Sequence, residues 1–149
     1  MKRLSYLMLC LLLISGTAFA AGTVTQGEAS HDADMVTIIF TCVGDSANGT
    51  IPDTDTTTAN TAAITGMYLY DVEVDPGTSA PDAADVLIKN TGGRDLLDGL
   101  GVNLIHATAT QSMGDSMPFF DKITGALTLD VDNQATVSAT YTVTWIFVK

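Results

Sequence analysis

The chain has 149 residues and combines 6 Lys and Arg with 17 Asp and Glu, giving a formal net charge of −11. After residue 20 only four basic residues remain, while all 17 acidic residues lie there. This balance excludes a nucleic-acid binder, because the chain has no basic patch with which to neutralise phosphates. It also excludes docking on an anionic lipid surface. The length after residue 20 suits one domain with one modest core.

The first 20 residues have the pattern of a secretory signal peptide. Lys2 and Arg3 precede an apolar run over residues 4–14, and residues 18–20 read Ala-Phe-Ala, which is typical of a cleavage site. We therefore expect cleavage after residue 20 and a secreted protein: extracellular, at the cell surface or periplasmic. No second long apolar run follows, so the sequence predicts no membrane span in the mature form.

Cys42 is the only cysteine after the predicted signal peptide, so an internal disulfide is excluded. It lies within the strand-like apolar run 38–43, which favours a buried thiol acting as a small hydrophobic side chain. A disulfide between two copies in an oxidising compartment is the alternative. A catalytic thiol has the least support, since neither His31 nor Arg94 is placed by the sequence to lower its pKa.

The first predicted elements are an extended arm and a strand. Residues 21–34 are small and polar, as in an extended N-terminal arm. Residues 35–43 alternate in polarity and predict a strand. Its inward side chains are expected to be Val36, Ile38, Phe40 and Cys42. Residues 44–60 are rich in turn-forming residues and predict a loop.

A second strand is predicted over residues 62–74, bent near Gly66. One face carries apolar and aromatic side chains, and the other carries acids. The inward set is expected to be Tyr68, Tyr70, Val72 and Val74. The outward set is expected to be Asp71, Glu73 and Asp75.

The remaining predicted strands are short and separated by turns rich in Gly, Asn and Pro. They cover residues 84–89, 104–110, 127–131 and 136–148, with a helical turn within 95–103. The last strand has the clearest alternation. Its inward set is Ala139, Tyr141, Val143, Trp145 and Phe147. Together these elements predict an all-β fold: one antiparallel β-sandwich, Ig-like or jelly-roll, over residues 35–149.

The acidic row Asp71, Glu73 and Asp75 is the leading candidate site. Spacing by two on a strand places the three carboxylates on one face, about 7 Å apart. Clustered carboxylate oxygens are ligands for Ca²⁺, so the row is a candidate metal site. The alternatives are a carboxylate pair for glycoside hydrolysis and a merely solvated outer face.

Other candidate residues carry weaker signals. Asp53 and Asp55 form a loop pair that lacks the Gly and closing Glu of an EF-hand loop. Asp130 and Asp132 are expected on the exposed side of their strand. The sequence offers no His/Cys zinc spacing, and a metal role for His31 beside Asp32 and Asp34 is weak. The last feature is an apolar pair proposed for an interface, Phe119 and Phe120. The aromatic side chains Tyr68, Tyr70, Trp145 and Phe147 are expected in the core rather than on a sugar-binding platform.

About half of the chain resembles small β-sandwich structural proteins of tailed-phage and prophage virion modules. The segments that carry this resemblance are turn-and-strand patterns: 64–66, 75–77, 80–81, 85–88, 93–99 and 123–129. The resemblance implies a non-enzymatic protein that assembles into particles. It transfers no functional residue to this chain.

The sequence contains no nucleophile elbow and no phosphate loop, and we predict that the protein is not an enzyme. The first functional hypothesis is a secreted structural subunit of a surface, filament or particle that forms homo-oligomers. Arm residues 21–34 would then add to an edge strand of a neighbour. The alternative is a Ca²⁺-dependent or carbohydrate-binding extracellular module.

Overall fold

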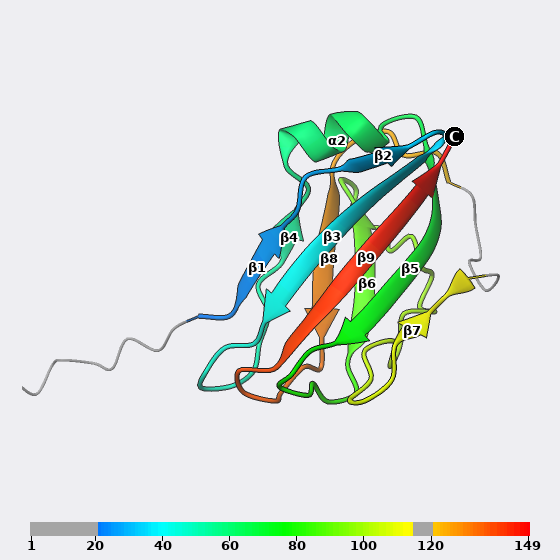
Figure 1. Ribbon diagram of the computed structural model, residues 1–149. Helices are drawn as coiled ribbons and strands as arrows, with labels where there is room; N and C mark the ends of the chain where they lie inside the picture. Colours follow the sequence, from blue (N-terminus) through cyan, green and yellow to red (C-terminus); the bar gives the residue numbers. More distant parts are fainter. Residues whose placement is uncertain (1–20, 115–120) are drawn as a thin grey trace, which may run out of the picture.

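The computed structural model describes residues 21–114 and 121–149 (Figure 1). The elements follow in chain order: β1 (Thr23–Gln26), β2 (Ser30–Asp32), β3 (Met35–Val43), β4 (Thr54–Asp55), α2 (Thr58–Ile64), β5 (Tyr68–Pro76), β6 (Asp85–Asn90), β7 (Gln111–Ser112), β8 (Leu127–Asp132) and β9 (Thr140–Val148). The predicted signal peptide and the Phe119–Phe120 pair lie outside the described residues. Within those residues, no helix has the length and apolar character needed to cross a membrane.

The predicted all-β sandwich is confirmed. The larger sheet has the strand order β1-β3-β9-β5-β7, and β2 pairs with the remaining length of β3. The smaller sheet has the order β4-β8-β6. All named pairings are antiparallel. Figure 1 shows the two sheets stacked face to face, with α2 across one end.

The core lies between the sheets and depends on the two strands that the sequence predicted best. Every second residue of β3 and β9 is buried, as expected from their alternation. Phe40 and Trp145 pack with their rings tilted and the ring centroids 4.4 Å apart, and Phe147 meets Trp145 edge-on. Each such side chain contributes about 1.5–3 kcal/mol when it is fully buried. These contacts fix β3 and β9 at the centre of the larger sheet.

The strand predicted over residues 62–74 is wrong in its first part. Residues 58–64 form the short helix α2, and β5 begins only at Tyr68. The Thr57 side chain caps the helix by accepting a hydrogen bond from the Asn60 N–H at 3.2 Å. Ile64 is completely buried at the end of the helix, so packing against the core stabilises a segment with modest helix propensity.

The predicted inward face of β5 is also wrong at its start. The pairing register with β9 shifts between Leu69 and Asp71, as in a β-bulge. As a result Leu69 is buried and Tyr70 is 48% exposed, whereas Val72 and Val74 face the core as predicted. The strand predicted over 104–110 is absent, and only Ile105 forms an isolated bridge, to Ala84.

Candidate functional site

The acidic row on β5 lies beside the short edge strand β7. The Asp71 carboxylate accepts hydrogen bonds from the Ser112 hydroxyl (2.8 Å) and the Gly114 N–H (2.7 Å). Asp75 accepts one from the Thr110 hydroxyl at 2.6 Å. Two of the three acids therefore hold the segment that contains β7.

Glu73 lies between these two acids, opposite Ser112 in the strand register. In residues 21–114 and 121–149, no group of three or more His, Cys, Asp or Glu side chains is arranged to hold a metal ion. Calcium binding by the row therefore stays a prediction.

A second acidic cluster lies on the outer face of the smaller sheet. Asp130 was expected to be exposed, but it is only 7% exposed and pairs with Lys89 across β6 and β8. Desolvation and then the charge of Asp130 raise the pKa of the Asp53 carboxyl above its usual value. Hydrogen bonding to Asp130 raises the pKa of Lys89. The sequence missed this cluster because its members come from three separate segments.

The predicted N-terminal arm is paired with its own chain. β1 and β2 lie along successive parts of β3, with Gly27, Glu28 and Ala29 between them. The buried Asn60 on α2 accepts a hydrogen bond from the Ala29 N–H and donates to the Gly27 carbonyl. It also donates to the Gln26 side chain at 2.6 Å. Asn60 thus joins the arm to α2 by hydrogen bonds. A groove of about 480 Å³, lined by residues of both segments, lies at this junction.

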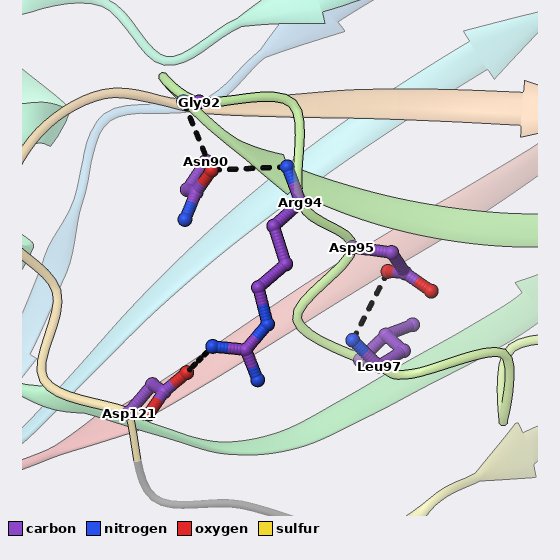
Figure 2. A network of polar contacts seen from close by, with 6 residues as sticks. All are labelled: Asn90, Gly92, Arg94, Asp95, Leu97 and Asp121. Carbon is purple, nitrogen blue, oxygen red and sulfur yellow. Dashed lines mark hydrogen bonds and ion pairs between the residues drawn. The ribbon is translucent and has the colours of Figure 1, made fainter.

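The turn after β6 is organised by half-buried and exposed polar groups, whose hydrogen bonds Figure 2 shows. The Asn90 side-chain oxygen accepts from the N–H groups of Gly92 (2.9 Å) and Arg94 (3.1 Å). The Arg94 guanidinium donates to Asp121 at 2.6 Å, and Asp95 accepts from backbone N–H groups of the turn. Of these residues, Arg94 and Asp95 lie in segment 93–99, one of the turn-and-strand patterns noted in the sequence. Their contacts give them a structural role.

The outer face of the larger sheet is free of charged side chains over three strands. We call this surface the neutral face. It consists of the outward residues of β1, β3 and β9: Thr23, Thr25, Met35, Thr37, Ile39, Thr41, Val43, Thr140, Thr142, Thr144, Ile146 and Val148. On β3 it exposes Met35 (37%), Ile39 (46%) and Val43 (36%). Acids border it on both sides: Glu73 of β5 lies opposite Thr144, and Asp32 of β2 lies opposite Met35.

Cys42 is buried against the core, which confirms the expected role of a small hydrophobic side chain. Burial raises the pKa of its thiol to about 12, so the thiol is protonated at neutral pH.

The weaker candidates are dispersed. Asp34 pairs with Lys149 at 3.3 Å, and His31 lies opposite Val36 on the edge of the sheet. His106 Nδ1 accepts two backbone N–H groups of its own turn. Of the four aromatic residues expected in the core, Trp145 and Phe147 are fully buried, Tyr68 is partly buried and Tyr70 is exposed.

Comparison of the chain with protein-family models, curated proteins and solved structures found no match. The neutral face is the functional candidate that sequence reasoning missed. Its signal was present in the threonines at every second position of residues 140–144, but single strands do not reveal which faces adjoin.

Proposed function

We propose that the protein is a secreted, non-enzymatic structural subunit that self-associates through the neutral face. One observation carries the proposal: a chain with a net charge of −11 keeps one face of three adjacent strands free of charge. The signal-peptide pattern of residues 1–20 supports secretion, and the resemblance to virion modules supports assembly.

The composition of the neutral face suits the centre of a protein interface. Interface centres are depleted in charged residues, and clustered apolar side chains on a surface mark interaction sites. Met35, Ile39 and Val43 supply that cluster, with threonine methyl groups between them. The acidic row then lies at the rim, where water and salt screen its charges.

The occupant that we propose is a second copy of the chain. An acidic copy experiences the least repulsion where neither surface carries charge. A two-fold contact uses the same patch on both copies, so it needs no other complementary surface. Two flat sheet faces can stack about 10 Å apart with their side chains interleaved.

Light scattering after gel filtration of residues 21–149 tests this function. We expect an oligomer whose native mass falls in Ile39→Glu, because the new carboxylate must be buried against its symmetry mate. Leu100→Glu is the matched control, since Leu100 is 49% exposed and lies outside the neutral face. We expect Leu100→Glu to keep the parental mass.

A monomer at every concentration would contradict self-association. An equal loss of association in both variants would remove the neutral face from the proposal. The measurement is repeated with Ca²⁺ and with chelator. Ca²⁺ binding to a monomer would favour the alternative, a Ca²⁺-dependent binding module.

A further inference from the structure

The turn that joins the N-terminal arm to the sheet is short and strained. Only Ala33 and Asp34 separate β2 from β3. Ala33 has a φ of 49°, in the left-handed region that a residue with a Cβ atom rarely adopts. Asp34 already extends the β3–β9 ladder, because its carbonyl accepts the Lys149 N–H at 3.1 Å. Reversal of the chain therefore depends mainly on Ala33.

Within the residues that the structure describes, the arm contacts the rest of the molecule through surfaces that a second copy also offers. β1 and β2 pair with β3, Val24 and Ala29 pack on the core, and the amide of Asn60 holds the backbone of residues 27–29. Every one of these partners lies after the turn. An arm from another chain can make the same contacts without any change in the domain that receives it.

We propose that the arm, residues 21–32, exchanges between two copies of the chain. Ala33 then adopts an extended conformation, β2 and β3 run as one continuous strand, and each arm lies on the β3 of the other copy. This inference rests on the proposed self-association. The exchanged arm adds a contact along β3 that is separate from the contact through the neutral face. Short, strained hinges favour such exchange, and exchange is a low-cost route to a dimer.

In the observed register, an exchanged dimer leaves no residue of the two continuous strands unpaired at the former turns. β2 pairs with β3 so that Asp32 lies opposite Met35. One further step in this register places Ala33 of one copy opposite Asp34 of the second copy. A two-fold axis then passes between the two continuous strands, and the ladder is unbroken through the former turns. Both copies gain the same pairs.

The equilibrium is set by the turn, because the arm makes the same contacts in both forms. Exchange releases the strain at Ala33 in both copies of the dimer. It is opposed by the translational and rotational entropy that is lost when two molecules associate. Dimer formation therefore increases with protein concentration. A substitution that relieves the strain at Ala33 in the closed monomer should reduce dimer formation.

A row of outward-facing threonines offers positions for introduced disulfides, which show whether the arm and β3 belong to the same copy. Thr25 on β1 lies opposite Thr41 on β3, and Thr41 lies opposite Thr142 on β9. Opposed residues of an antiparallel pair have Cα atoms about 4.5–5.5 Å apart, which suits a disulfide. The test pair is Thr25→Cys with Thr41→Cys. The control pair is Thr41→Cys with Thr142→Cys. Both are made with Cys42→Ala and oxidised with diamide.

We expect the associated fraction of the test pair to yield covalent dimers on a non-reducing gel, because the linked arm and β3 belong to different copies. The control pair should yield linked monomers only, because β3 and β9 belong to one domain in either form. Linked monomers from an associated test pair would overturn the exchange and leave the proposed self-association intact. A test pair that forms no disulfide while the control does would also overturn it.

Variants of the hinge provide a second measurement that does not depend on introduced cysteines. Ala33→Gly removes the penalty of the left-handed conformation, and we expect it to lower the dimerisation constant about tenfold or more. Deletion of Ala33 and Asp34 removes the turn and should leave no monomer at micromolar concentration. Unchanged dimerisation in Ala33→Gly, or a monomeric deletion variant, would overturn the proposal. Loss of all association in the unmodified protein would instead contradict the proposed function.

Discussion

Individual carboxylates in this protein differ sharply in their surroundings. Asp130 is nearly buried and paired with Lys89, whereas Asp53 is exposed and has Asp130 as its neighbour. A carboxylate whose charge is paired stabilises the fold, but a second carboxylate beside it experiences partial desolvation and repulsion. Asp53 is therefore the acid whose ionisation opposes folding.

Replacement of this acid should stabilise the protein. The pKa of Asp53 is higher in the folded state, so the folded state binds its proton more tightly than the unfolded chain does. The resulting destabilisation is fully present above the folded pKa and disappears as the pH falls through the unfolded value of about 3.9. We expect Asp53→Asn to increase the free energy of unfolding at pH 7 by less than about 1 kcal/mol, because the site is exposed.

Urea unfolding at neutral and acidic pH measures this effect. The gain should shrink as the pH falls towards about 4, and it should also shrink in about 1 M salt, where exposed charges are screened. A gain that is the same at both pH values would show that repulsion at Asp53 is not its cause.

At the scale of elements, the loop between β6 and β7 closes the smaller sheet by running close along β6. At Gly101 the two backbones are hydrogen-bonded, because the Gly101 carbonyl accepts the Val86 N–H at 2.9 Å. A Cβ atom on Gly101 would lie 1.8 Å from the Val86 carbonyl oxygen. Any larger residue must therefore push the loop away from the strand.

Gly101→Ala should destabilise the protein by about 1–3 kcal/mol, the range typical of overpacking. Gly125→Ala is the matched control, since its Cβ would meet only the Thr91 methyl group at an ordinary 3.6 Å. We expect the control to stay within about 0.5 kcal/mol. Equal midpoints of urea unfolding in the two variants would contradict this account of Gly101.

Elements with regular alternation were predictable, and those that depend on neighbours were not. β3 and β9 repeat buried and exposed residues without interruption, so period-two patterning located both strands and their inward faces. The bulge in β5 shifts the pattern by one residue, which moved Tyr70 outward although the sequence alternates through it. Helix α2 is short and Thr-rich, and burial of Ile64 stabilises it.

At the scale of the whole molecule, the acidic charge and the neutral face have opposite effects on association. The net charge of −11 repels other copies, while the neutral face provides a surface where they can meet. Association should therefore increase when salt screens the repulsion. We expect the native mass of residues 21–149 to be larger in about 0.5 M than in about 0.02 M NaCl, as the Debye length shortens.

Light scattering at the two salt concentrations, with Ile39→Glu as the control variant, makes this measurement. The native mass of the variant should not increase with salt if the neutral face is the contact. Dissociation of the unmodified protein in high salt would point to a contact made by opposite charges, and would contradict a contact through the neutral face.

The sequence by itself determined the all-β class, the acidic character, the inward faces of β3 and β9 and the burial of Cys42. These follow from composition and from alternation along single strands, which are local properties of the chain. The tertiary structure alone decided that Asp130 is paired with Lys89 and that the arm lies on β3, where Asn60 accepts a hydrogen bond from its backbone. It also decided that three uncharged strand faces adjoin. Each of these depends on strand order and register, which place residues far apart in the chain side by side.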